Sequence, residues 1–142
     1  MPAIVVGTDG SPGAERALRR AAALARDSGE RLYVVTAVPS TPSYAEPLEG
    51  SAKREPVDLR ATAEQVAARE AAHAEAEGVE VETVAREGDP AQVLIDVAQE
   101  VGADLIVVGA RGLSTIERFL LGSVSSKLAH HAACDLLIVR DR

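Results

Sequence analysis

Glycine and serine residues in the second half of the chain have the types and spacing of an anion-binding loop. Gly-Ala-Arg-Gly at 109–112 directly follows residues 104–108, which have the pattern of a buried strand, and nine residues separate it from Gly-Ser-Val-Ser at 122–125. Glycine allows a tight turn and lets a bulky ligand approach the main chain. A Gly-Ser pair that opens a helix offers free backbone N–H groups, where the helix dipole adds about half a positive charge. The pattern predicts a cradle for a phosphate group.

The same spacing has a second interpretation that needs no ligand, in which a serine simply caps a helix after a glycine turn. Arg111 also has two interpretations, since it either pairs with a phosphate or is an exposed arginine on a polar loop. In the binding interpretation, backbone N–H groups and the hydroxyls of two serines face the phosphates. The residues concerned are Gly109, Gly112, Gly122, Ser123, Val124 and Ser125.

A second glycine loop, Gly-Thr-Asp-Gly at 7–10, follows the apolar run 3–6. Asp9 in this loop can bond a ribose hydroxyl or hold a Mg²⁺ ion that bridges phosphates. It can also close an Asx turn ahead of Ser11, which precedes Pro12 at a predicted helix start. The two roles are compatible.

The elements that position these loops alternate between strand and helix. Patterning predicts strands at 3–6, 32–38, 79–85, 104–108 and 135–140, and helices at 14–27, 58–77, 90–101 and 123–131. The proline-rich stretch 39–56 is expected to be a loop. The alternation predicts a mostly parallel sheet in which right-handed crossovers put the first and fourth strands side by side. Ligands bind beyond the carboxyl ends of strands at such a switch point, where both glycine loops meet.

Composition narrows the class of protein. The 142 residues are 46% hydrophobic and 26% charged, which predicts one globular domain over residues 1–142. Aromatic residues at 2% and a net charge of −7 argue against nucleic-acid binding, and no apolar run is long enough for a membrane span. The single Cys134 fits a reducing compartment, so a soluble cytoplasmic protein is expected. Gly-x-Ser-x-Gly, the conventional P-loop and a metal-binding histidine pair do not occur.

With these landmarks in order, the chain resembles the universal stress protein family over nearly its whole length. The motifs are Val-Gly-Thr-Asp-Gly-Ser at 6–11, Gly-Asp-Pro-Ala at 88–91, and Gly109, Gly112, Gly122 and Ser123 at the spacing that ATP-binding members carry. The resemblance implies an α/β fold with three layers. Its open parallel five-stranded sheet would be Rossmann-like, of the adenine nucleotide alpha hydrolase type, with strand order 3-2-1-4-5.

The resemblance also implies a ligand and a function. ATP, with Mg²⁺ at Asp9, would lie in the cleft, where the backbone near Ala37 and Val38 would contact the adenine and Gly7 and Thr8 would line the wall. The protein would be a nucleotide-responsive stress or regulatory protein. Any ATP hydrolysis should be slow because no general base is identifiable. The alternatives are an AMP- or cyclic-nucleotide-binding member, an adenylating α/β enzyme using the same cleft, and a ligand-free interaction module.

The last predicted strand is continuously apolar from Leu136 to Val139 and would form a sheet edge. Such an edge invites pairing with another chain, and in the family this strand mediates a two-fold dimer. The alternative is a strand covered by the preceding helix and blunted by the charged residues at 140–142. The expected partners are an adenine nucleotide, a second copy of the chain and an unidentified protein, with no nucleic acid and no membrane.

Overall fold

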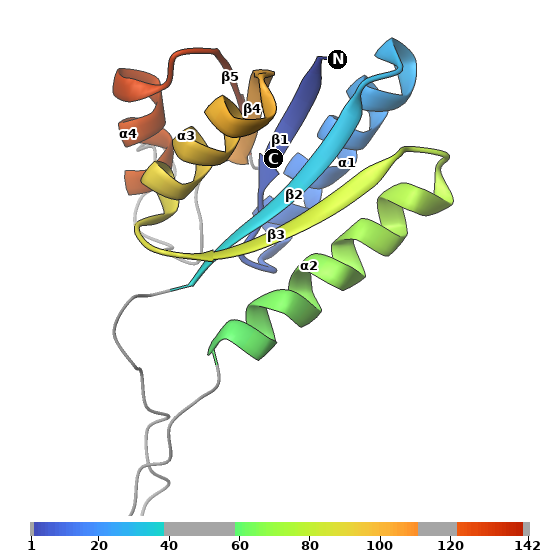
Figure 1. The fold of residues 1–142 in the computed structure, drawn as a ribbon, viewed down its shortest axis with the longest axis horizontal. Helices are drawn as coiled ribbons and strands as arrows, with labels where there is room; N and C mark the ends of the chain where they lie inside the picture. Colours follow the sequence, from blue (N-terminus) through green and yellow to red (C-terminus); the bar gives the residue numbers. More distant parts are fainter. Residues whose placement is uncertain (1, 39–58, 111–121, 141–142) are drawn as a thin grey trace, which may run out of the picture.

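Parallel strands form a sheet with the order β3-β2-β1-β4-β5 in this computed structural model, which describes residues 2–38, 59–110 and 122–140. Helices cover both faces of the sheet (Figure 1). The predicted α/β class, the three layers and the strand order are confirmed. The elements are β1 (Ala3–Gly7), α1 (Pro12–Ser28), β2 (Arg31–Val38), α2 (Leu59–Ala76), β3 (Val81–Glu87), α3 (Pro90–Val101), β4 (Ala103–Gly109), α4 (Ser123–His131) and β5 (Asp135–Val139).

The sheet divides the core into two apolar layers, because successive side chains of a strand point to opposite faces. α1 and α2 pack on the layer that contains Val6 and Val34, whereas α3 and α4 pack on the layer that contains Val5 and Val35. Figure 1 shows the two helix pairs on opposite sides of the sheet. α1 meets its layer mainly through buried alanines, so its backbone lies close to the strands. The aromatic-poor composition is thus accommodated by small and β-branched side chains.

Two helices begin and end at the residues that the sequence predicts. The Ser11 hydroxyl accepts a hydrogen bond from the Ala14 amide at 3.2 Å and caps α1, which ends at Gly29 with φ 73°. Asp89 caps α3 in the same way, and Gly102 ends it with φ 68°. Both terminal glycines adopt the left-handed conformation, which a residue with a Cβ atom adopts only at a cost.

The third strand begins and ends two residues later than the pattern predicts, at Val81–Glu87 instead of 79–85. Val79 is buried, and its amide donates to the Ala74 carbonyl at 3.3 Å, so it belongs to the turn that follows α2. The carboxyl end reaches Glu87 because β3 pairs with β2 as far as Val38. β3 lies at an edge of the sheet, as the sequence predicts. The predicted alternation between a dry and a wet face is not seen, because the consecutive residues Glu82 and Thr83 are both exposed.

The predicted cap Asp58 and the predicted loop at 39–56 lie outside the described residues. Among the helices of the described ranges, none combines the length and the apolar character needed to cross a bilayer.

Two carboxyl groups, those of Glu30 and Asp104, meet where β2 and β4 begin. Burial raises the pKa of Glu30, and the charge of Asp104 and a hydrogen bond with its carboxyl group raise that pKa further. The folded state therefore holds the Glu30 proton more tightly than the unfolded chain does. This stabilisation is complete below the ordinary glutamate pKa and is lost as the pH rises through the raised pKa.

We predict that Asp104→Asn increases the stability of the variant relative to the parent as the pH rises from about 4 to about 7. The substitution removes the charge that repels the Glu30 carboxylate. Urea unfolding at the two pH values measures the free energies, with Glu75→Gln, on the exposed side of α2, as the control. A difference between Asp104→Asn and the parent that is independent of pH would contradict the prediction.

Candidate functional site

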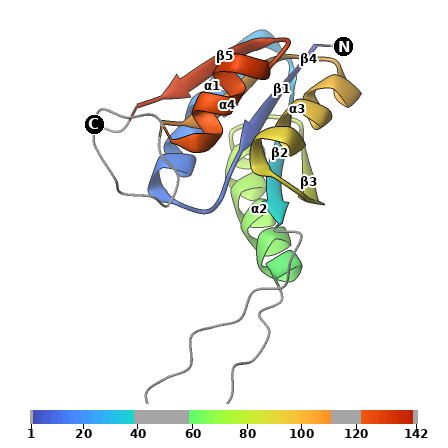
Figure 2. The ribbon, with the colours of Figure 1, turned by 90° about the vertical axis from the view of Figure 1, so that its left-hand side faces the viewer.

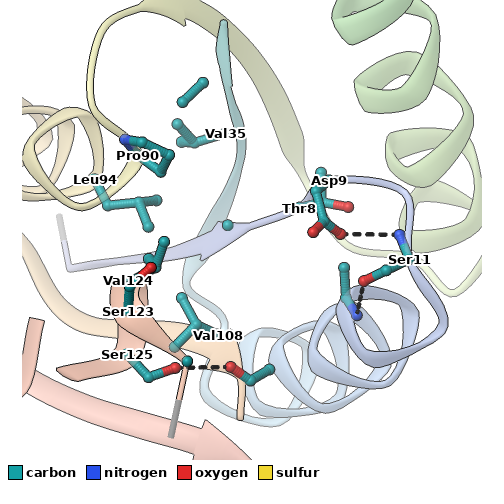
Figure 3. A pocket seen from close by; sticks show the side chains of 15 residues that line it. Thr8, Asp9, Ser11, Val35, Pro90, Leu94, Val108, Ser123, Val124 and Ser125 are labelled. Atoms are coloured by element: carbon teal, nitrogen blue, oxygen red, sulfur yellow. Dashed lines mark hydrogen bonds between the residues drawn. The ribbon is translucent and has the colours of Figure 1, made fainter. Parts of the chain in front are cut away.

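A cavity of about 320 Å³ lies at the carboxyl ends of β1, β2 and β4. Its volume is at the lower end of the range of small-molecule sites, about 300–1,000 Å³. Figure 3 shows Pro90 and Leu94 on one side of it and Thr8, Asp9 and Ser11 on the other. The described residues that line it are Gly7, Thr8, Asp9, Ser11, Ala14, Val35, Ala37, Pro90, Leu94, Val108, Gly109, Gly122, Ser123, Val124 and Ser125.

The loop after β1 is held by its own side chains. The Thr8 amide donates to the Val35 carbonyl at 2.9 Å, and the Thr8 hydroxyl accepts from the Gly10 amide at 3.2 Å. Asp9 Oδ1 accepts from the Ser11 amide at 2.9 Å, so the predicted Asx turn is confirmed. The Asp9 side chain is nevertheless exposed, and the turn engages its Oδ1. The turn thus fixes the carboxylate at the cavity while leaving Oδ2 for a ligand.

The opposite side of this loop rests on α2. Gly10 has a φ of +80°, and a Cβ atom added there would lie 3.4 Å from the Val66 methyl groups and 3.6 Å from Arg69 Nη2. The same Nη2 lies 3.6 Å from Oε1 of Glu70, a carboxylate that is buried in the interior. The close approach of α2 therefore fixes the loop from behind.

The loop between β4 and α4 is closed by hydrogen bonds on both sides of residues 111–121. The Gly122 amide donates to the Ala110 carbonyl at 2.7 Å, and the Ser125 hydroxyl donates to the Gly109 carbonyl at 2.9 Å (Figure 3). Gly122 is the cap of α4 and no side chain caps the helix, so the interpretation of Ser123 as an ordinary cap is wrong.

The first turn of α4 lines the cavity and carries backbone N–H groups that the helix itself does not use. The Ser126 amide makes the first intrahelical bond, to the Gly122 carbonyl at 3.0 Å. The amides of Ser123, Val124 and Ser125 precede that bond and have no partner within the helix. The sequence suggested the Gly122 amide as a free donor, but this amide donates to the Ala110 carbonyl.

The start of α3 forms the wall opposite the loop of Asp9. Pro90 and Leu94 line the cavity, and Asp89 accepts from the Gln92 amide at 3.1 Å. Lys127 of α4 lies 3.2 Å from the other Asp89 oxygen. The Gln92 amide and then the Lys127 ammonium group hold the pKa of Asp89 below its usual value. Asp89 is therefore charged at neutral pH.

Most of the predicted site residues do come together around this cavity. Val38 does not line it, and its carbonyl accepts from the Gly88 amide at 2.8 Å. Arg111 and Gly112 lie outside the described residues. The predicted residues in the lining are Gly7, Thr8, Asp9, Ala37, Gly109, Gly122, Ser123, Val124 and Ser125.

Much of the apolar part of the lining was missed in the sequence, although Ala37 and Val124 were predicted. Val35 precedes Ala37 by two residues, so the period of a strand could have indicated it. Val108 adjoins Gly109, and successive residues of a strand point to opposite faces, so the period gives no such signal for Val108. Nothing local to Pro90 and Leu94 indicates their place, because it follows from the packing of α3 on the sheet. The lining residues not predicted are Ser11, Ala14, Val35, Pro90, Leu94 and Val108.

A comparison with protein families matches residues 1–140 to the universal stress protein family. The chain belongs to this family. A universal stress protein of Methanocaldococcus jannaschii is 33% identical over 137 residues, which cover 96% of this chain and 81% of the relative. The sequence resemblance, which rested on three short motifs, is thus confirmed.

Solved universal stress proteins share the fold as well as the sequence. A crystal structure of a universal stress protein in complex with cAMP has a TM-score of 0.75 and 32% identity, and the match covers 99% of this chain and 98% of that one. A universal stress protein from Archaeoglobus fulgidus in complex with dAMP has a TM-score of 0.74 and 27% identity, with 99% and 98% covered.

We predict that Gly7→Ala destabilises the protein by about 1–3 kcal/mol, the usual cost of an overpacked core. The added methyl group would lie 2.9 Å from Leu94 Cδ1 and 3.4 Å from Val108 Cγ1. In a Leu94→Ala background, which removes the nearest atoms, the cost of Gly7→Ala should be much smaller. Chemical denaturation of the four proteins measures this coupling. Strict additivity would show that Leu94 is not what excludes a side chain at position 7.

Proposed function

We propose that this universal stress protein binds ATP in the cavity between α3 and α4 and acts as a nucleotide-responsive regulatory protein. The observation that supports this most is the convergence of two glycine loops, the first-turn amides of α4 and an apolar wall on one cavity. The proposal includes one domain over residues 1–142. It also includes a cytoplasmic setting, in which the half-buried Cys134 stays a free thiol.

Each part of a nucleotide has complementary groups in the lining. Phosphates are matched by the amides of Ser123, Val124 and Ser125 and by the dipole of α4. A ribose hydroxyl is matched by the exposed carboxylate of Asp9. The base is matched by the apolar surface of Val35 and Ala37 on β2. The Ser125 hydroxyl donates to Gly109, so it would contact a phosphate only after rotating.

Asp9 also fits a supporting role toward Mg²⁺. The described residues contain no group of three or more ligands that could hold a metal by themselves. Mg²⁺ is commonly held by one or two carboxylates together with substrate phosphates, and it neutralises phosphate charge there. Asp9 supplies one carboxylate at the cavity, so in the proposal the ion binds together with the nucleotide.

The relatives support an adenine nucleotide, since two of them have been solved with cAMP and with dAMP. The preference for ATP rests on the spacing of Gly109, Gly112, Gly122 and Ser123. AMP or a cyclic nucleotide is the alternative ligand. Among the described lining residues Asp9 alone carries a carboxylate, and one of its oxygens accepts from the Ser11 amide. Hydrolysis is therefore expected to be slow.

Ser123→Pro tests the role assigned to the α4 amides. Position 123 is the first residue of the helix, where proline is tolerated, and Gly122 has the extended ψ of 163° that a residue before proline requires. The substitution removes one backbone donor with little cost to the helix. We predict about tenfold weaker ATP binding, the usual worth of a hydrogen bond to a charged group.

Isothermal titration calorimetry with ATP, AMP and cAMP in the presence of Mg²⁺ measures the affinities and their order. Ser123→Ala, which keeps the amide and removes the hydroxyl, is the matched control and should bind more tightly than Ser123→Pro. No binding of any of the three nucleotides by protein free of co-purified ligand would refute the proposed function. Pyrophosphate release with added acids or amines would instead support the adenylating enzyme.

We further propose a homodimer through β5. This strand lies at an edge of the sheet and pairs with β4 alone among the described strands (Figure 2). Its apolar residues Leu136, Leu137, Ile138 and Val139 are all only half-buried. Apolar side chains on an unpaired edge favour association with another chain.

Ile138→Lys should therefore convert the dimer into a monomer, because a charged residue on an edge strand opposes pairing. Light scattering after size-exclusion chromatography measures the molar mass. Val81→Lys is the matched control, since Val81 is also half-buried but lies on β3 at the opposite edge. A dimer that survives Ile138→Lys and is lost in Val81→Lys would place the interface on the other edge.

A further inference from the structure

An ion pair joins the two helices that flank the cavity. Lys127 Nζ of α4 lies 3.2 Å from Asp89 Oδ1, at the residue that caps α3. The other oxygen of Asp89, Oδ2, accepts from the Gln92 amide at 3.1 Å. Pro90 follows Asp89 directly and lines the cavity. The pair therefore bridges α3 and α4 beside the cavity.

Lys127 follows Ser123 by four residues and Val124 by three. Residues at these spacings are neighbours on one face of a helix, and both Ser123 and Val124 line the cavity. The Lys127 side chain is 57% exposed, so it can turn about its flexible stem without leaving a buried site. An exposed ion pair contributes little to stability, and another anion can replace its carboxylate at low cost.

The part of the cavity lining that the structure describes supplies no positively charged side chain for a polyphosphate. Asp9 is the one charged side chain among the described lining residues, and it is negative. The α4 amides supply partial charges only. A polyphosphate bound at the first turn of α4 would therefore attract a mobile cation from the next turn of the same helix.

We propose that Lys127 exchanges partners, pairing with Asp89 when the cavity is empty and with a phosphate oxygen when a nucleotide is bound. This inference rests on the proposed function of the site. It makes Lys127 a residue that selects nucleotides with phosphate chains over the bare nucleoside, and it makes Asp89 a competitor for the same ammonium group. Nucleotide binding then breaks the ion pair between α3 and α4 and frees the Asp89 carboxylate at the surface.

A double-mutant cycle on Lys127→Met and Asp89→Asn tests the exchange, with ATP and adenosine as ligands in calorimetry. Asparagine is as good a helix cap as aspartate, so Asp89→Asn keeps the start of α3. We expect Lys127→Met to weaken ATP binding about tenfold, as for a hydrogen bond between charged groups, and to leave adenosine binding unchanged. Asp89→Asn should strengthen ATP binding about twofold to threefold by releasing the ammonium group.

The decisive value is the effect of Asp89→Asn in the Lys127→Met background. If Asp89 acts by holding Lys127, its substitution has no effect on ATP binding there. An equal gain in both backgrounds would mean that the Asp89 charge repels the phosphates directly, and it would overturn the exchange. An ATP affinity that does not change in Lys127→Met would also overturn the exchange.

Arg86→Met is the matched control, because it removes one positive charge from another exposed ion pair, which joins Arg86 of β3 to Glu100 of α3. ATP affinity should be retained in this variant, and an equal loss in it would reduce the Lys127 effect to net charge and overturn the exchange. Circular dichroism of each variant confirms folding. If the parent protein binds neither ATP nor adenosine, the proposed function fails together with this inference, whereas unchanged binding in all variants refutes the inference alone.

Discussion

Val6 of β1 lies beside Val107 of β4 in a parallel register, and the site depends on this pairing. Two loops that are far apart in the sequence leave the sheet side by side because these strands end together. The chain crosses from β1 toward β2 and β3 on one side, and from β4 toward β5 on the other. The outward connections leave room between the two loops, and α3 and α4 form the walls of that room. Any change that shifted the β1–β4 register would separate Asp9 from the α4 amides.

The same groups that build the cavity are also used to stabilise the fold. Asp9 closes a turn, Gly122 closes the loop onto Ala110, and the Ser125 hydroxyl holds the Gly109 carbonyl. Each of these bonds satisfies a buried or half-buried polar group that would otherwise be costly. What remains for a ligand is one carboxylate oxygen and the first-turn amides of α4. This division between groups used by the fold and groups left for a ligand suits a ligand-binding site, because the groups that are left are fixed before a ligand arrives.

The fold and the centre of the site were predictable because both rest on local chemistry. A few neighbouring residues determine each of the predicted features. These features are the apolar runs, the helix start at Ser11–Pro12, the glycines that end helices and the Asx turn at Asp9. The start of β3 was not predictable, since the alternation of valine with polar residues fits either register until α2 engages Val79. Leu94 and the Lys127–Asp89 pair were missed for a similar reason. Their positions depend on how α3 and α4 pack, and no short stretch of sequence encodes that.

The helix starts have a collective consequence. Ser11 at the cap of α1, Pro90 at the start of α3 and Ser123 at the start of α4 all line the one cavity. The N-terminal ends of three helices, where the helix dipoles place partial positive charge, therefore border the same cavity. The chain as a whole carries a net charge of −7, so its average field repels anions. An approaching anion would meet repulsion over most of the surface and attraction at this cavity. The field of the molecule would therefore steer the anion to the cavity before any specific contact forms.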